Sequence, residues 1–261
     1  MTLAAESVHY LERGQGAAVV LLHGLFGGPE NWVPVLEDLS DEFHLFAPQL
    51  PLDRQPTRNA RSFQSIHQLT DFIKGFFDSV GIERATIGGN SLGGQVAIDF
   101  CLKYPEHVER LIITGSAGLF ERSLSGGGLP KVTREFIHEK ACEVFYDPRL
   151  VTEELVDELQ QMLMDRTYVR FLIRVAKATR DYNVKSELEK LKLPTLIVWG
   201  QEDRITPPGV AQEFKEHLDN AQLVFLDRCG HSPPIEQPQA FSRILRDFLS
   251  QPVASLSSPA R

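Results

Sequence analysis

A serine set between two glycines is the first feature of this sequence that could do chemistry. Gly89, Ser91 and Gly93 form the pattern G-x-S-x-G. A short apolar run precedes it at residues 85–87, and apolar residues recur with helical spacing after it until Pro105. This order predicts a strand, a sharp turn and a helix, in which side chains at the two glycines would collide. The turn would expose the serine hydroxyl and direct the positive end of the helix toward it.

A serine hydroxyl is a weak nucleophile near neutral pH, so it needs a base within hydrogen-bond reach and a carboxylate that orients the base. Two loops that follow predicted strands supply both groups. Asp203 follows the apolar run at residues 194–200, and His231 follows the run at residues 223–226. The interval between them accommodates one helix and one strand, which would place the two loops side by side. We therefore predict that Ser91, His231 and Asp203 act as nucleophile, base and orienting acid.

The elements that must position these residues alternate between strands and helices. Helices with one apolar face separate the predicted strands. This alternation predicts an α/β fold with a mostly parallel sheet covered by helices on both faces. The predicted strands lie at residues 8–16, 17–22, 44–48, 85–87, 111–114, 194–200 and 223–226.

Between residues 116 and 190 the alternation stops and only helical patterns occur. One of these helices has a typical start, in which Thr152 is followed by two glutamates. We expect residues 1–115 and 191–261 to form the core domain and residues 116–190 to form a helical cap. Such an insertion would lie over the carboxyl ends of the strands, where ligands bind in open α/β sheets.

Composition restricts the classes of partner. The formal net charge of the 261 residues is −8 and no basic stripe is present, which argues against binding to nucleic acid. No apolar run approaches the roughly 20 residues that span a bilayer, and the first residues do not form a secretory signal. Three cysteines without metal-ligand spacing favour a reduced, cytoplasmic protein. We expect a small-molecule substrate, no cofactor or metal, and a monomer or homodimer.

The sequence resembles the α/β-hydrolase superfamily over nearly its whole length. In that superfamily's order it carries an H-G pair at His23 after an early strand, the serine turn at Ser91, W-G-x-x-D ending at Asp203, and C-G-H ending at His231. The resemblance implies an α/β-hydrolase fold with a mostly parallel sheet of the eight-stranded type and an inserted helical cap. It also places the triad on the three residues predicted above.

The resemblance further implies an oxyanion hole made of two backbone N–H groups. In the superfamily these belong to the residue after H-G and to the residue after the nucleophile, which correspond to Leu25 and Leu92. The amides matter more than the leucine side chains, because negative charge builds on the former carbonyl oxygen during acyl transfer.

The identity of the nucleophile indicates the class of reaction. Members of this fold that open epoxides or displace halide use aspartate where Ser91 stands, whereas serine implies attack on a carbonyl, an acyl-enzyme and its hydrolysis by water. A small carboxylic ester or thioester is the favoured substrate. Carbon–carbon hydrolysis is the alternative, because residues 89–94 are similar to the serine turn of meta-cleavage product hydrolases. Residues 23–27, however, depart from the H-G-x-G-P-G loop of those enzymes. A receptor-like protein with a nearly silent triad is an alternative of another class.

Several side chains could line a cleft between the cap and the sheet, although apolar residues on a helical stripe also fit a plain core. Arg166, Arg170 and Arg174 recur every four residues on one helix face. They form either a solvated face or a clamp for a substrate carboxylate, and a clamp would favour carbon–carbon hydrolysis. The candidate substrate-binding residues are Phe26, Phe120, Met164, Tyr168, Phe171 and Arg174.

Three polar residues near the predicted triad have secondary roles in this interpretation. His23 is expected to support the loop that carries the oxyanion amide rather than to take part in proton transfer. Asn90 is expected to steady the serine turn. Glu202, next to Asp203, is an alternative orienting acid, and we expect it to be a solvated neighbour.

Overall fold

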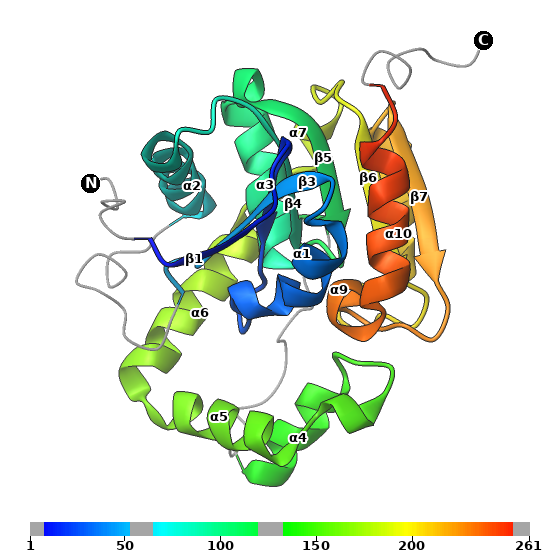
Figure 1. Ribbon diagram of the computed structural model, residues 1–261. Helices are drawn as coiled ribbons and strands as arrows, with labels where there is room; N and C mark the ends of the chain where they lie inside the picture. Colours follow the sequence, from blue (N-terminus) through cyan, green and yellow to red (C-terminus); the bar gives the residue numbers. More distant parts are fainter. Residues whose placement is uncertain (1–7, 53–64, 120–132, 253–261) are drawn as a thin grey trace.

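One sheet of seven strands runs through the part of the chain that the computed structural model describes, residues 8–52, 65–119 and 133–252 (Figure 1). Its strand order is β1-β3-β2-β4-β5-β6-β7. β1 is antiparallel to β3 and the other neighbouring pairs are parallel. The prediction of a mostly parallel sheet is confirmed, with seven strands in the described ranges in place of the eight-stranded type. The strands are β1 (Tyr10–Arg13), β2 (Ala17–Leu22), β3 (Phe43–Pro48), β4 (Ala85–Asn90), β5 (Val108–Thr114), β6 (Thr195–Gly200) and β7 (Ala221–Leu226).

β2 is apolar along its whole length because helices cover both faces of the sheet. On β2, Val20 and Leu22 belong to one buried cluster, whereas Val19 and Leu21 belong to the other. This division follows from the two-residue period of a strand, which sends successive side chains to opposite faces. An unbroken apolar run of this kind therefore indicates a strand buried on both sides.

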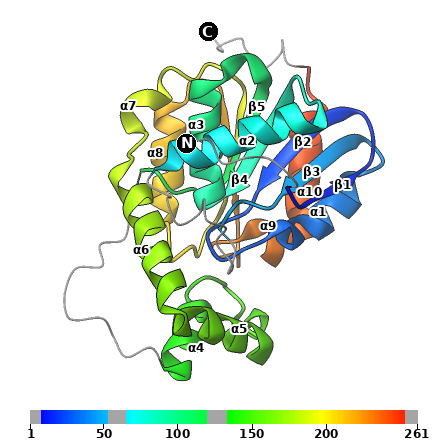
Figure 2. The same ribbon diagram turned by 90° about the vertical axis from the view of Figure 1, so that its left-hand side faces the viewer.

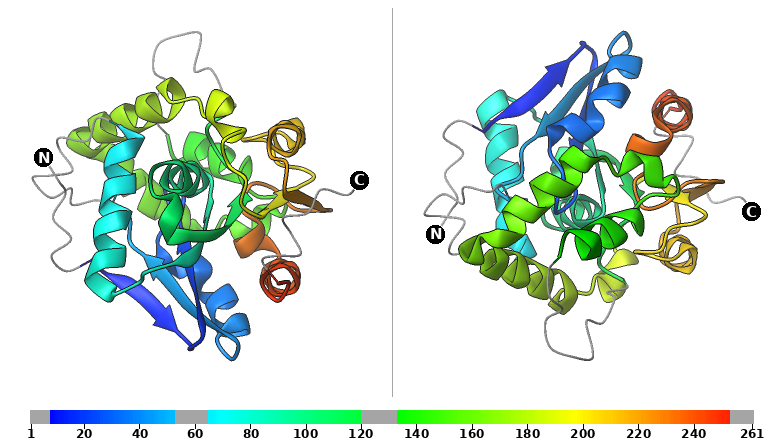
Figure 3. Two further views of the ribbon diagram at one scale, coloured as in Figure 1. Left: turned by 90° about the horizontal axis from the view of Figure 1, so that it is seen from above. Right: turned by 90° about the horizontal axis from the view of Figure 1, so that it is seen from below.

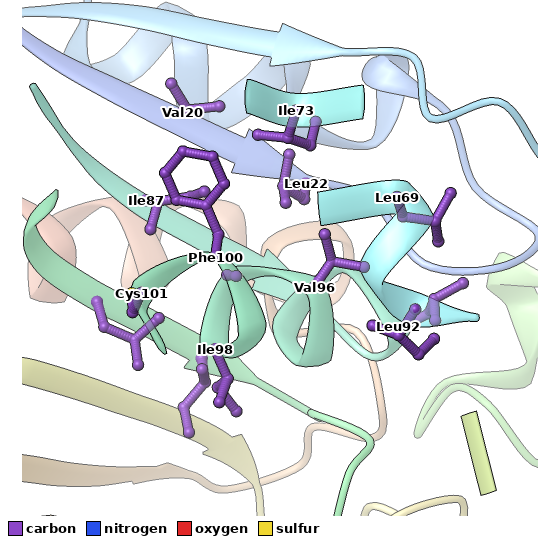
Figure 4. Close-up of a cluster of buried hydrophobic side chains, with 14 of the residues drawn as sticks. Val20, Leu22, Leu69, Ile73, Ile87, Leu92, Val96, Ile98, Phe100 and Cys101 are labelled. Carbon is purple, nitrogen blue, oxygen red and sulfur yellow. The ribbon is translucent and has the colours of Figure 1, made fainter. Parts of the chain in front are cut away.

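Helices α2 (Ile66–Val80), α3 (Leu92–Lys103) and α8 (Pro208–His217) cover one face of the sheet. Helices α1 (Val33–Leu39) and α10 (Pro238–Leu249) cover the other face, so that α2 and α10 lie on opposite sides (Figure 3). Figure 4 shows the core between α3, α2 and the sheet, where Val96 and Phe100 face β2 and α2.

Several short helical segments connect the longer elements. α9 (Pro233–Glu236) ends just before α10 begins. The break falls before Pro238, which lacks the N–H that a continuous helix would need. The 3-10 turns are η1 (Pro29–Trp32), η3 (Pro105–His107) and η4 (Pro148–Leu150).

Between β5 and β6 the described chain is helical, with α4 (Arg134–Cys142), α5 (Glu153–Met164), α6 (Arg166–Asp181) and α7 (Lys185–Leu188). α4 and α5 lie beyond the carboxyl ends of the strands, and α6 runs back to pack against α2 (Figures 1 and 2). The side chains of Thr133, Thr152 and Asp165 accept N–H groups at the starts of α4, α5 and α6. The division into core and cap domains remains a prediction. None of the helices in the described ranges has the length and apolar character needed to cross a bilayer.

The serine turn allows a direct test of the fold. A Cβ on Gly93 would lie 2.7 Å from the carbonyl oxygen of His23 and closer still to that of Leu22. We expect Gly93→Ala to lower the free energy of unfolding by about 2–4 kcal/mol, since backbone atoms must shift. Denaturant unfolding monitored by circular dichroism would measure the change.

Gly209→Ala is the matched control, because Gly209 begins α8 and a Cβ there would have no neighbour within 4 Å. We expect this variant to be unchanged or stabilised by about 0.5–1 kcal/mol. Equal unfolding midpoints for Gly93→Ala and Gly209→Ala would show that the turn relaxes at no cost.

Candidate active site

Ser91 occupies a strained turn between β4 and α3. Its φ of 57° and ψ of −120° lie in a region that residues with side chains rarely adopt. A Cβ on Gly89 would lie 2.6 Å from the nitrogen of Gly94, so the turn requires glycine there. The Ser91 N–H donates to the carbonyl of Thr114 at 3.0 Å, and its carbonyl accepts the Ala117 N–H at 3.1 Å. These bonds to the end of β5 hold the strained conformation.

The loops after β6 and β7 bring Asp203 and His231 into contact. His231 Nδ1 lies 2.9 Å from Asp203 Oδ2, and both residues are buried. A carboxylate at Nδ1 favours the tautomer with the proton on that nitrogen, which leaves Nε2 as an acceptor. The pair can therefore act as an oriented base.

Backbone and hydroxyl donors fix the carboxylate of Asp203. Its Oδ1 accepts the N–H groups of Ile205 at 2.8 Å and Thr206 at 2.9 Å, and the Thr206 hydroxyl donates to Oδ2 at 2.9 Å. The same hydroxyl oxygen lies 3.3 Å from His231 Nδ1. Thr206 was not among the site residues predicted from the sequence, although a threonine three residues after a strand-end aspartate is a recognisable signal for such a turn.

Asn90 joins the serine turn to the loop between β7 and α9, which carries His231 and is called the histidine loop below. Its side-chain amide donates to the carbonyl of Thr114 at 3.1 Å and to the carbonyl of His231 at 2.9 Å. The residue before Ser91 is therefore bonded directly to the backbone of His231. The Ser91 hydroxyl itself makes no hydrogen bond to another residue in the described part of the chain.

The H-G loop lies against the serine. A Cβ on Gly24 would be 3.3 Å from the Cβ of Ser91, which places Leu25 beside the turn. Within the described ranges, the N–H groups of Leu25 and Leu92 donate no hydrogen bond to the protein. These two backbone N–H groups, which come from two different segments, therefore flank the serine and can donate to a substrate.

His23 supports this loop. It is buried, its Nδ1 lies 2.8 Å from the Gly24 carbonyl, and its Nε2 accepts the Leu50 N–H at 2.9 Å. Burial lowers the pKa of His23 to about 4, so the imidazole is neutral at pH 7. Nδ1 therefore bonds within the H-G loop, and Nε2 joins this loop to the segment after β3.

Glu202 also belongs to the loops around the site. Its carboxylate accepts the Cys229 N–H at 2.9 Å, and its own N–H donates to the Cys229 carbonyl at 3.0 Å. Glu202 therefore forms hydrogen bonds with the backbone of the histidine loop, whereas Asp203 forms one with the imidazole of His231.

The predicted substrate-binding residues occupy different environments. Tyr168 and Phe171 are buried in the core, and the Tyr168 hydroxyl donates to the Leu52 carbonyl at 3.1 Å. Phe26 is 54% exposed on the H-G loop, and Met164 is 77% exposed at the end of α5. Phe120 lies outside the described residues.

Arg174 is exposed, as are Arg166 and Arg170. It lines a hollow of about 460 Å³ between α2 and α6, together with His67 and Tyr182. None of the triad candidates lines this hollow. Among the residues that the structure describes, no cluster of three or more histidine, cysteine or acidic side chains could hold a metal ion.

A model of the alpha/beta hydrolase family matches residues 19–244 of the chain. The chain belongs to this family. The match extends from β2 into α10, so this α/β hydrolase carries both the serine turn and the histidine loop inside the matched region. The resemblance drawn from the sequence motifs is confirmed.

Relatives of this α/β hydrolase match over nearly the whole chain. The 2-hydroxy-6-oxononadienedioate/2-hydroxy-6-oxononatrienedioate hydrolase of Paraburkholderia phymatum is 32% identical, over 94% of this chain and 91% of that protein. The meta-cleavage product hydrolase CumD of Pseudomonas fluorescens IP01 has a similar structure, with a TM-score of 0.79, 28% identity and coverage of 95% and 96% of the two chains. MGS-MChE2, an alpha/beta hydrolase enzyme from a Mar Chica lagoon sediment metagenome, gives a TM-score of 0.73 at 30% identity, covering 94% and 98%. The protein is therefore a hydrolase of this fold.

The buried imidazole of His23 predicts a pH dependence of folding. Its pKa of about 4 in the folded chain lies below the ordinary value of 6.5 for histidine. Between these values the unfolded chain binds a proton that the folded chain lacks. The contribution of His23 is therefore complete above about pH 6.5 and is lost as the pH falls toward 4. The difference between these two pKa values corresponds to about 3 kcal/mol in the free energy of unfolding.

Urea unfolding of the wild type and of His23→Gln, each at about pH 7 and pH 4.5, would measure this effect. Gln keeps polar groups in the loop but does not titrate. We expect the free energy of unfolding to fall by about 2–3 kcal/mol more in the wild type than in the variant. The same decrease in both proteins would contradict the lowered pKa that is assigned to His23.

Proposed function

We propose that this α/β hydrolase attacks a carbonyl carbon with Ser91, using His231 as the general base and Asp203 to orient it. The hydrogen bond of 2.9 Å between Asp203 and His231 carries this proposal, because it joins a base and an acid beside the strained serine turn. Asn90 supports it by bonding the backbone of His231 from the residue before Ser91.

In this mechanism the Ser91 hydroxyl adds to the substrate carbonyl while His231 Nε2 takes its proton. The resulting oxyanion accepts the open N–H groups of Leu25 and Leu92. The tetrahedral intermediate then collapses, and the leaving group departs with the proton that His231 returns. Water repeats the attack on the acyl-enzyme, releases the acid and restores the serine.

The comparisons favour carbon–carbon cleavage over ester cleavage. The sequence favoured an ester, but the curated relatives at 31% and 32% identity are 2-hydroxy-6-oxononadienedioate/2-hydroxy-6-oxononatrienedioate hydrolases. We therefore propose a 2-hydroxy-6-oxo dienoate as the first substrate class. Its leaving group would be a carbon atom, which receives the proton from His231.

A small carboxylic ester is the second candidate. Arg166, Arg170 and Arg174 are exposed. In the described part of the chain the only buried arginine or lysine is Arg110, which donates to the Gln251 carbonyl. A substrate carboxylate therefore has no buried cation in these residues, and an uncharged ester needs none. The receptor-like alternative predicts no turnover of either class.

The triad assignment predicts selective labelling and loss of activity. We expect a fluorophosphonate to modify Ser91, and Ser91→Ala to lower kcat by about 10³-fold or more. Asp203→Asn removes the charge that orients His231 and should lower kcat by about 10³- to 10⁴-fold. Mass spectrometry of the labelled peptide and steady-state kinetics would measure both. Glu202→Gln, which changes the neighbouring acid, should have a much smaller effect than Asp203→Asn.

The class of bond is tested separately with the wild-type enzyme. We expect a higher kcat/KM for a 2-hydroxy-6-oxo dienoate, followed by the loss of its visible absorbance, than for a short-chain p-nitrophenyl ester. Turnover of the ester alone would select the second candidate and leave the triad intact. If the enzyme turned over neither substrate while the fluorophosphonate still labelled Ser91, the receptor-like alternative would be supported.

A further inference from the structure

The carboxylate of Glu236 accepts hydrogen bonds from backbone N–H groups in two separate segments of the chain. Its two oxygens each lie 3.0 Å from the Gly230 nitrogen, and Oε1 also accepts the Ser232 N–H at 3.1 Å. Its Oε2 accepts the Tyr146 N–H at 2.7 Å. Gly230 and Ser232 are the neighbours of His231, so this carboxylate holds the backbone on both sides of the proposed base.

The segment that contains Tyr146 also bonds His231 directly. The carbonyl of Val144 accepts the His231 N–H at 2.8 Å. This segment follows α4 and belongs to the helical region between β5 and β6. A Cβ on Gly230 would lie 2.6 Å from the Val144 oxygen and 2.9 Å from the Tyr146 nitrogen. The two segments therefore approach so closely that the histidine loop requires glycine there.

We propose that Glu236 is a positioning residue for His231, and that it ties the histidine loop to the segment at residues 144–146. This inference rests on the proposed function of His231 as the general base. A neutral acceptor could satisfy one or two of the three N–H groups, whereas a carboxylate has lone pairs for all three and forms stronger, charge-assisted hydrogen bonds. Glu236 therefore links the segment after α4 to the backbone that carries the imidazole of His231.

The energetic reason is that general-base catalysis depends strongly on geometry. A displacement of about 1 Å in a reacting group can cost about 10²-fold in rate. Without Glu236, the backbone at Gly230 and Ser232 would turn toward water, and the imidazole between them would shift away from Asp203 and Ser91. Glu236 touches no reacting atom, so its contribution acts through His231 alone.

Two substitutions of Glu236 test the proposal in the full chain, with the substrate that the wild type turns over. Glu236→Gln places an amide NH₂ against backbone donors, so it cannot accept all three bonds, and we expect kcat to fall about 10-fold. Glu236→Ala removes every acceptor, and we expect kcat to fall about 10²-fold. In both variants KM should change much less than kcat, because the substrate does not contact Glu236.

Formate supplies the readout that separates positioning from general stability. It fits the space left by the side chain in Glu236→Ala and carries the same acceptor group, so we expect added formate to raise kcat of this variant several-fold. Glu213→Gln is the matched control, because Glu213 pairs with Lys185 on the outer side of α8. We expect no change in kcat and no response to formate in this control.

Values of kcat within twofold of wild type in both Glu236 variants would overturn the proposal. A loss of kcat that formate does not alter, accompanied by a matching fall in the unfolding midpoint, would also overturn it by assigning a structural role only. If Glu236→Ala does not fold, the kcat and KM of Glu236→Gln decide the question. Full activity in Ser91→Ala would instead refute the proposed function, an outcome independent of the Glu236 measurements.

Discussion

Close approach of backbone segments at the carboxyl ends of the strands is the constraint on which the site depends. A Cβ on Gly93 would lie 2.7 Å from the His23 oxygen, and a Cβ on Gly200 would lie 2.7 Å from the carbonyl carbon of Cys229. Since only glycine leaves room for these contacts, the ends of β2, β4 and β6 and the histidine loop converge on a small volume. The catalytic candidates lie on these segments.

Three acidic residues organise the loops by accepting backbone N–H groups. Asp203 accepts from the turn that follows it, Glu202 from Cys229, and Glu236 from both neighbours of His231 and from Tyr146. A carboxylate offers two oxygens with several acceptor positions, so one side chain can satisfy several donors that a loop leaves without partners. This arrangement gives irregular loops a defined geometry without lengthening the regular elements.

The helices between β5 and β6 add a second level of organisation. α6 packs on α2 and shares the main core through Phe171 and Val175, whereas α4 and α5 have a small apolar cluster of their own around Ile137 and Val156. The segment after α4 nevertheless contacts the histidine loop, where the Val144 carbonyl accepts the His231 N–H. This region is therefore joined to the site by main-chain bonds as well as by apolar packing.

Sequence alone determined the α/β class and the order of most elements, and it predicted the residues of the candidate site. These features are encoded locally, by the two-residue and 3.6-residue periods of apolar residues and by the glycines around Ser91. Sequence alone did not reveal Glu236, because its partners are backbone N–H groups that almost any residue could supply. It did not reveal Thr206 either, because the proximity of Thr206 to His231 depends on how two distant loops meet. It also could not show that Tyr168 and Phe171 are buried, since core residues and cleft residues have the same helical spacing. Only the tertiary structure decided these points, because a hydrogen bond or a packing contact between distant segments depends on where the folded chain brings them together.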